Sequence, residues 1–266
     1  MSTVVALHDG LLQVRTLGPS AAPAVLALHG VGSSTTYLAE AVAPPLLAAG
    51  WRVLLVPLRG HVGATALRDP AAHVLDRHVD DLARVGEALR PVAAVGVSLG
   101  AHAVVAAAAR GWLEVAVAVA ALPAWAGRAV PGEGPHAATA AEVALHGVAG
   151  MLERLRDEQG LRPWLRRVLL RDLAAHDAAS LRAALVALDG GLAPTGIELG
   201  ELRCRLGVVG WADDPGHPLA VARQWAAAAP HARLAELSLD DPDADRTALG
   251  RVVSGLLGVP GEHATR

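Results

Sequence analysis

One serine stands in a context that could make its hydroxyl a nucleophile. Ser98 follows a short apolar run, Val92–Val97, and precedes an alanine-rich stretch typical of a helix. Gly96 and Gly100 flank it at two residues on either side. In such a strand–turn–helix, small flanking residues let the strand and the helix approach closely while the serine is held in a strained turn. The segment therefore predicts a nucleophile at the carboxyl end of a strand, the alternative being an ordinary Gly-rich turn whose serine caps the helix.

The composition indicates one large α/β domain and excludes several classes of protein. Its 266 residues include no lysine, and 23 arginines against 26 acidic residues give a net charge of −3. No basic stripe suggests nucleic-acid binding. The single cysteine, Cys204, excludes an internal disulfide, and the chain does not open with a charged leader and a long apolar segment. Apolar runs such as Val115–Pro123 are too short to span a membrane, so we expect a cytoplasmic protein.

The elements that position the serine follow from the apolar pattern. Asp9-Gly10, between two apolar runs, predicts an antiparallel hairpin at the start of the chain. The later strands are expected over Ala24–Leu28, Trp51–Pro57, Val92–Val97, Val115–Leu122, Arg205–Gly210 and Ala232–Leu239. The helices expected between and after them cover Thr35–Gly50, Ala71–Leu89, Leu219–Ala229 and Arg246–Leu257. This alternation predicts a doubly wound, mostly parallel sheet with an initial antiparallel hairpin.

A helical block interrupts the alternation. From Trp125 to about Arg203 the sequence predicts helices and no strand, over His136–Leu155, Leu161–Leu173 and Asp177–Leu188. We expect residues 1–125 and 204–266 to form the α/β core and residues 126–203 to form a helical lid.

Four features, in this order along the chain, resemble the α/β-hydrolase family. They are the initial hairpin, His29-Gly30 after the third strand, Arg59–Gly63 after the fourth, and Gly96–Gly100 after the fifth. The helical insertion also follows the sixth strand, where that family carries its lid. The resemblance covers nearly the whole chain and implies the α/β-hydrolase fold.

The resemblance implies that Ser98 attacks a carbonyl group. The backbone N–H groups of Leu99, at the helix start, and Val31, after His29-Gly30, would stabilise the oxyanion. His29 itself is expected to brace the oxyanion loop beneath the site. The family's acid follows the seventh strand, often four residues before a proline; Asp214 fits that spacing with Pro218, and Asp213 is the alternate.

The general base departs from the family pattern. The family's histidine lies in the loop after the last strand, but Leu239–Asp245 contains four aspartates and no histidine. A serine needs a base poised near neutrality, and solvated carboxylates titrate near 4. His217, in the acid loop, is the first candidate and His61 the second. His102 lies one helical turn beyond Ser98 and should pack beside the helix, and His263 follows the final helix.

Other chemistries find less support in the sequence. A chain without lysine cannot be a Walker A protein, although Arg59 keeps an NADP-binding reductase as a remote alternative. We expect no metal and no cofactor, because the histidines and aspartates of 73–81 lack a two-histidine i, i+4 pair. The lid arginines have acidic neighbours and are expected on an exposed face. Its apolar residues should roof an aliphatic site that also holds Trp125, Trp211 and Tyr37.

Two functions therefore compete. The first is a serine hydrolase that acts on a small ester, lactone or thioester, with Ser98, Asp214 and His217 as its catalytic residues and Val31 and Leu99 as oxyanion donors. The second is a degenerate member of the family that binds a ligand or partner, or catalyses a non-hydrolytic step. The missing histidine after the last strand is the feature that separates them.

Overall fold

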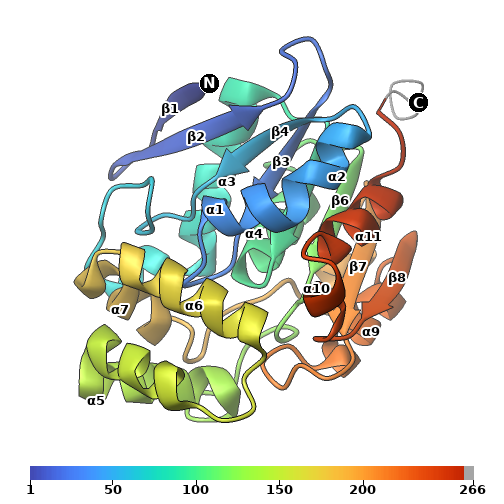
Figure 1. Ribbon diagram of the computed structural model, residues 1–266. Helices are drawn as coiled ribbons and strands as arrows, with labels where there is room; N and C mark the ends of the chain where they lie inside the picture. Colours follow the sequence, from blue (N-terminus) through green and yellow to red (C-terminus); the bar gives the residue numbers. More distant parts are fainter. Residues whose placement is uncertain (261–266) are drawn as a thin grey trace.

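Eight strands form one sheet in the computed structural model, which describes residues 1–260 (Figure 1). The strands are β1 Ser2–Ala6, β2 Leu11–Leu17, β3 Ala24–Leu28, β4 Arg52–Val56, β5 Ala93–Val97, β6 Val117–Ala121, β7 Arg205–Trp211 and β8 Ala232–Leu237. Their order is β1-β2-β4-β3-β5-β6-β7-β8. Pairing is antiparallel from β1 to β2 and from β2 to β4, and parallel through the rest of the sheet. The predicted mostly parallel sheet with an initial hairpin is confirmed.

Helices cover both faces of the sheet, and consecutive strand residues alternate between two apolar cores. Leu26 and Leu54 pack in one core, and Val25 and Val53 in the other. Strands buried on both faces carry the near-continuous apolar runs seen in the sequence. The helices and short helical turns are α1 Thr35–Tyr37, η1 Leu38–Val42, α2 Ala43–Ala48, η2 Pro70–His73, α3 Leu75–Leu89, α4 Leu99–Ala109, α5 Gly134–Asp157, α6 Pro163–Ala175, α7 Ala178–Val186, α8 Gly196–Gly200, α9 Leu219–Ala228, α10 Asp241–Ala244 and α11 Ala248–Leu257.

Two predicted helices are wrong in part. The single helix expected over Thr35–Gly50 is divided into α1, the π-helical turn η1 and α2. The cause is the proline pair in the first turn of α2: proline has no N–H to donate, so the α-helical ladder cannot run through it. The helix expected from Ala71 begins only at Leu75, because Val74 is extended (φ −70°, ψ 155°). Val74 is consequently exposed instead of lying on the apolar side of the helix.

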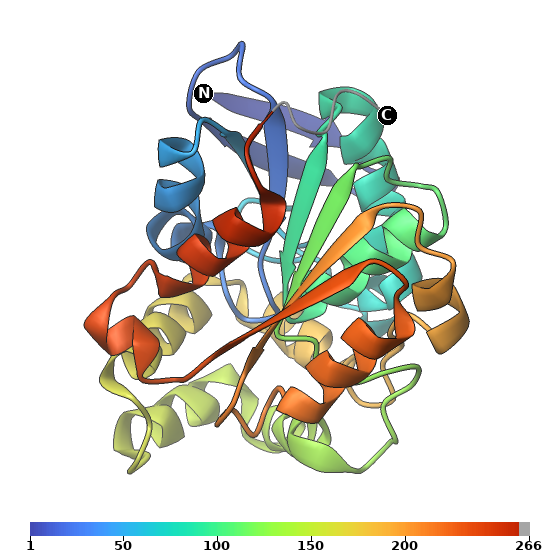
Figure 2. The same ribbon diagram turned by 90° about the vertical axis from the view of Figure 1, so that its right-hand side faces the viewer.

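The lid segment lies beyond one edge of the sheet, where α5, α6 and α7 run across the loops that follow the strands (Figures 1 and 2). Trp164 Nε1 donates to Leu239 O, after β8, at 2.8 Å. Ser180 Oγ donates to Gly60 O, after β4, at 2.6 Å. We therefore name α5, α6 and α7 the cap. The short α8 that follows them packs against α4 and α9, with Glu198 paired to Arg110 at 2.8 Å, and joins the segment to the core.

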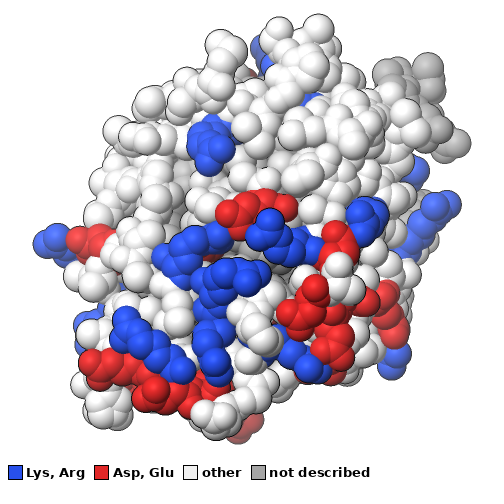
Figure 3. Space-filling view, viewed as in Figure 1, with Lys and Arg blue, Asp and Glu red and all other residues white. Residues whose placement is uncertain are grey.

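Charged side chains gather along α6 and its borders, where basic and acidic groups lie side by side (Figure 3). Two ion pairs there join the cap to the core: Arg162 with Asp240, and Arg171 with Glu40, both at 2.7 Å. A third, Arg154 with Glu158, lies within the cap at 2.8 Å. Exposed pairs of this kind contribute roughly 0 to 1 kcal/mol each, so they orient the cap more than they stabilise it. No helix within residues 1–260 is long and apolar enough to cross a membrane.

Four histidine side chains among residues 1–260 are fully buried. They are His29, His61, His78 and His102, each at most 2% exposed. Burial lowers the pKa of His29, His78 and His102 to about 3 and that of His61 well below its ordinary value. Three of them accept a backbone N–H at Nε2, which requires a neutral ring: His29 from Leu58, His61 from Gly32 and His102 from Ala124.

Because these buried imidazoles are neutral in the folded protein, we expect the protein to lose stability in acid. Their pKa is lower in the folded than in the unfolded chain, so the stabilisation is complete above about pH 6.5 and is lost as the pH falls toward 3. Each group costs up to about 1.4 kcal/mol per pH unit in that window. Asp81, whose pKa burial raises to about 6, contributes with the opposite sign. Urea unfolding should therefore give a free energy several kcal/mol lower at pH 5.0 than at pH 7.5, and equal values would contradict the prediction. His102→Gln should show a weaker pH dependence.

Candidate active site

Ser98 lies in a sharp turn between β5 and α4. Its backbone has a positive φ (φ 54°, ψ −119°), a region that side-chain-bearing residues rarely adopt. A Cβ on Gly96 would overlap the carbonyl oxygen of Gly100, and one on Gly100 would lie 2.5 Å from Leu28 O. Gly30, in the loop after β3, also lies close to the turn, since a Cβ there would lie 2.9 Å from Ser98 Cβ. The spacing of the glycines thus has a direct steric cause, and the turn has the shape that the sequence predicts.

A continuous hydrogen-bonded chain links Ser98 to an imidazole and a carboxylate. His217 Nε2 lies 2.8 Å from Ser98 Oγ, and His217 Nδ1 lies 2.7 Å from Asp214 Oδ2. Because the carboxylate can only accept, Nδ1 carries the proton and Nε2 is left to accept from the serine hydroxyl. The structure therefore brings together all three side chains that the sequence selects.

Electrostatics keeps the carboxylate of Asp214 ionised. Burial by itself raises the pKa of Asp214, but the hydrogen bond and charge of His217 and the N–H of Gly216 outweigh it, so the pKa lies below its ordinary value. Gly216 N donates to Asp214 Oδ1 at 2.8 Å. The carboxylate is thus fixed on both oxygens, one by the loop backbone and one by the imidazole. The negative carboxylate in this arrangement can stabilise the positive charge that forms on His217 when the imidazole accepts a proton.

Asp213, the alternate acid, points to the other side of the loop. Its Oδ1 accepts from Leu239 N at 2.8 Å and its Oδ2 from Ser238 Oγ at 3.1 Å. These groups lie just after β8, where the family's histidine would stand. That segment enters α10 instead, and Asp241 Oδ2 accepts from Ser238 N at 2.7 Å. Asp213 therefore ties the acid loop to the end of β8 and has no contact that would orient His217.

The other candidate histidines that the structure describes are hydrogen-bonded to backbone groups around the site. His61 donates from Nδ1 to Arg59 O at 2.9 Å and accepts from Gly32 N at 3.0 Å, so neither nitrogen is free to act on Ser98. His29 donates to Gly30 O at 2.8 Å and braces the loop, as the resemblance implies. His102 packs beside α4 with its ring 4.4 Å from that of Trp125. His263 lies outside the described residues.

The loop after β3 presents Val31 between two fixed neighbours. Gly32 has a positive φ of 71° and its N–H is taken by His61, and Ser33 N donates back to Gly30 O at 3.1 Å. The amide of Gly32 is therefore not available to a ligand. Leu99 is the first residue of α4, where backbone N–H groups have no partner within the helix. These positions are compatible with the predicted donors, Val31 and Leu99.

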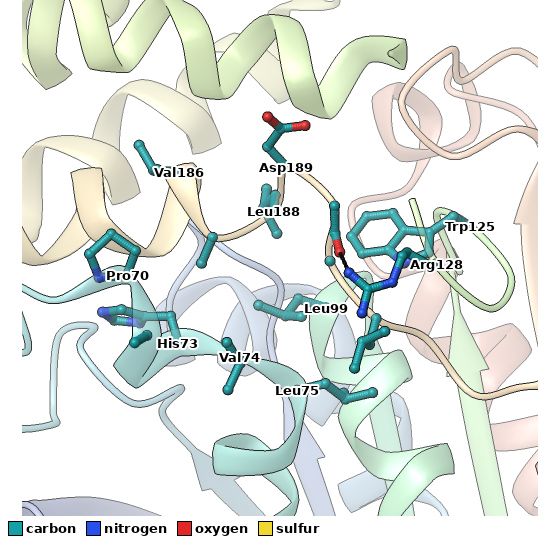
Figure 4. A pocket seen from close by; sticks show the side chains of 15 residues that line it. Pro70, His73, Val74, Leu75, Leu99, Trp125, Arg128, Val186, Leu188 and Asp189 are labelled. Carbon is teal, nitrogen blue, oxygen red and sulfur yellow. Dashed lines mark hydrogen bonds between the residues drawn. The ribbon is translucent and has the colours of Figure 1, made fainter. Parts of the chain in front are cut away.

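A cavity of about 340 Å³ lies between the core and the cap (Figure 4). Leu99 lines it from α4, Trp125 from the loop after β6, and Leu188 from the segment after α7. Arg128 lies at one side and donates to Gly190 O at 3.2 Å. The expectation of an aliphatic cavity with Trp125 agrees with this lining. Trp211 and Tyr37 are elsewhere, in the apolar core that also holds Trp164.

The residues considered for metal or nucleotide binding are engaged in other contacts or do not form a cluster. Arg59, the candidate for a nucleotide phosphate, is 2% exposed and bonded to Asp81 at 2.9 Å and Asp9 at 2.6 Å. It is therefore closed to a ligand, which removes the observation that favoured a reductase. Over residues 1–260, no group of three or more His, Cys, Asp or Glu side chains is placed to hold a metal ion.

One residue near the site was not expected from the sequence. His136, in the first turn of α5, donates from Nε2 to Gly216 O at 3.1 Å, and its ring lies 4.9 Å from that of Trp125. The sequence contains no local signal for this contact, because it joins the cap to a loop 80 residues later. Only the folded arrangement of cap and core reveals it.

Comparisons with known proteins agree with this architecture. The enol-lactonase from Burkholderia xenovorans LB400 superposes with a TM-score of 0.80 at 21% identity, over 96% of this chain and 99% of that one. The esterase EaEST from Exiguobacterium antarcticum gives 0.78 at 16%, over 96% and 100%. The bottromycin epimerase BotH, solved with bottromycin A2, gives 0.72 at 22%, over 97% and 99%. A search of curated protein sequences finds no match.

At these identities the structural neighbours establish the fold alone, and their titles include a lactonase, an esterase and an epimerase. A sequence model of a whole family is the more specific finding. The model described as "Alpha/beta hydrolase family" matches residues 25–246, from β3 to beyond α10. The protein therefore belongs to the alpha/beta hydrolase family.

Proposed function

We propose that the protein is a serine hydrolase that acts on a small ester, lactone or thioester. The observation that carries this proposal is the unbroken chain from Ser98 Oγ through His217 to Asp214, at 2.8 and 2.7 Å. Each distance lies in the range that proton transfer requires. The unusual origin of the base, on the acid loop, leaves the order of the three groups in space unchanged.

The reaction begins when Ser98 Oγ attacks the carbonyl carbon and His217 Nε2 takes the hydroxyl proton. The negative charge that forms on the carbonyl oxygen is held by two N–H groups, that of Val31 in the loop after β3 and that of Leu99 at the positive end of α4. His217 then gives its proton to the leaving oxygen or sulfur as that bond breaks, which leaves an acyl group on Ser98. A water molecule, deprotonated by His217, then attacks the acyl carbon. The bond from that carbon to Ser98 Oγ breaks, His217 returns the proton to Oγ, and the acid is released. Asp214 stays ionised throughout and holds His217 in the required tautomer.

The cavity supports an aliphatic acyl group as the part of the substrate nearest the serine. Leu99 connects the cavity to the proposed oxyanion site, because its N–H is a proposed oxyanion donor and its side chain lines the cavity. The remaining lining is mostly aliphatic, and about 340 Å³ holds a short to medium chain. Arg128 lies at its side and, among the described residues, has no carboxylate partner within 4 Å. Because the carboxylate of Asp189 also lines the cavity, Arg128 suits substrates whose acyl chain ends in a polar group.

The serine and its base are tested by covalent labelling with a fluorophosphonate, located by peptide mass spectrometry. The wild type should carry the label on Ser98, and Ser98→Ala should carry none. His217→Ala should react on the order of 10²- to 10⁴-fold more slowly, because the hydroxyl loses its base. Hydrolysis of p-nitrophenyl acetate should fall in parallel. Folded wild-type protein that stays unlabelled would overturn the proposal and favour the degenerate, ligand-binding or non-hydrolytic role.

The acyl cavity is tested by filling it from its exposed rim. Val74 lines the cavity and is 43% exposed, so Val74→Trp narrows the space without disturbing the core. The variant should hydrolyse p-nitrophenyl acetate like the wild type and lose about tenfold or more in kcat/KM on the hexanoate, since the longer chain no longer fits. Val92→Trp, at a similarly exposed position before β5, is the matched control. Equal chain-length profiles for Val74→Trp and the wild type would show that acyl chains bind elsewhere.

A further inference from the structure

The proposed acid and base lie on one short loop, so the position of that loop decides whether His217 reaches Ser98. Asp214 and His217 both lie between the end of β7 at Trp211 and the start of α9 at Leu219. A shift of the loop moves both side chains together relative to Ser98, which stands on a separate turn. Since the Ser98–His217 contact spans 2.8 Å, a displacement of about 1 Å is enough to break it.

One side of this loop is held by the core. Asp213 binds Leu239 N and Ser238 Oγ just after β8, at 2.8 and 3.1 Å, and Ala212 N donates to Leu237 O at 2.8 Å. These bonds fix the first half of the loop. They precede Asp214 in the chain and do not reach the half that carries His217.

The second half is held from the cap. The peptide unit between Gly216 and His217 is bonded at both ends: its N–H donates to Asp214 O at 3.3 Å, and its carbonyl accepts from His136 Nε2 at 3.1 Å. That peptide is attached directly to the Cα of His217. The cap therefore holds the backbone of the base through a single side chain.

The surroundings of His136 keep it a neutral donor. Burial, followed by the proximity of His217, lowers the pKa of His136 to about 4, against smaller opposing effects of Gly216 and Asp214. The ring centroids of His136 and His217 lie 6.1 Å apart, and the ring of Trp125 lies 4.9 Å from that of His136. A second charge is thus kept away from His217 at the moment when it becomes an imidazolium. The ring of His136 is also restrained by packing and not only by its hydrogen bond.

We propose that His136 is a positioning residue for His217, and that the base is set in place only when α5 of the cap is docked on the core. This inference rests on the proposed hydrolase function and adds a condition for it. The hydrogen bond from the cap fixes the half of the loop that the bonds of Asp213 do not reach. Binding a substrate between cap and core and orienting the base are then linked events.

The test compares three substitutions of His136. His136→Gln keeps a donor close to the position of Nε2, His136→Asn keeps the amide but is too short to reach Gly216 O, and His136→Phe keeps the ring without a donor. His146→Phe, at an exposed position of the same helix, is the control. For each variant we would measure kcat and KM on p-nitrophenyl acetate, the rate of fluorophosphonate labelling of Ser98, and the melting temperature.

His136→Asn and His136→Phe should lower kcat and the labelling rate by the same factor, about 10- to 100-fold, with KM within about twofold of the wild type. His136→Gln should recover most of the loss, and His146→Phe should match the wild type. Wild-type kinetics in both His136→Asn and His136→Phe, with Ser98 still labelled, would overturn the role of His136 alone. So would a loss in His136→Gln as large as in His136→Asn, since the donor would then be irrelevant. An unlabelled wild type would overturn the hydrolase proposal itself.

Discussion

The hydrogen bond between Ser98 Oγ and His217 Nε2 is the contact on which the arrangement of the site depends. Its two ends come from different turns, one after β5 and one after β7, and no local interaction in the chain brings them together. The parallel sheet does so, because β5, β6 and β7 are neighbours whose carboxyl ends lie at one edge. Ligands of open α/β sheets bind outside that edge, so the fold and the site have a common cause.

The turn at Ser98 stores strain that the sheet must offset. A residue held at positive φ costs of the order of 1–3 kcal/mol and persists only where its surroundings fix it. Here Ser98 N donates to Ala121 O at 2.8 Å, and the flanking β5 and α4 are almost completely buried. Bulk at Gly96 or Gly100 would push these elements apart. The glycines are thus needed for the approach of backbone to backbone, and the serine is pushed outward as a result.

Much of the fold was predictable from the sequence because its signals are local. Buried strands appear as apolar runs, Asp9-Gly10 marks the hairpin, and the order of motifs assigns the family. One error concerns a local signal, since the proline pair after Val42 divides the first predicted helix, and the others arose where tertiary contacts decide. Val74 leaves its helix to border a cavity, and Tyr37 and Trp211 pack in an apolar core instead of lining that cavity. Partners distant in the sequence leave no periodic pattern to detect.

The site was predictable in the same uneven way. Ser98 followed from a pattern, and Asp214 followed from its distance to Pro218. His217 was supported only by its place in the acid loop, because the loop that usually supplies the base contains no histidine. The structure brings the three side chains together. Their catalytic roles stay a prediction. His136 lay beyond prediction, since a contact between cap and loop depends on how two folded parts meet.

The separation of Asp214 and His217 by only three residues has a mechanical consequence. In a site whose three residues come from three separate loops, each of the two hydrogen bonds between them can break independently. Here the Asp214–His217 hydrogen bond lies within one short loop and moves with that loop. Of the two hydrogen bonds in the chain, a shift of the loop therefore breaks only the one to Ser98. A shifted loop would keep the Asp214–His217 pair assembled and merely separate it from Ser98. Restoring the chain of three side chains then needs one rigid displacement of the loop and no rebuilding of the pair.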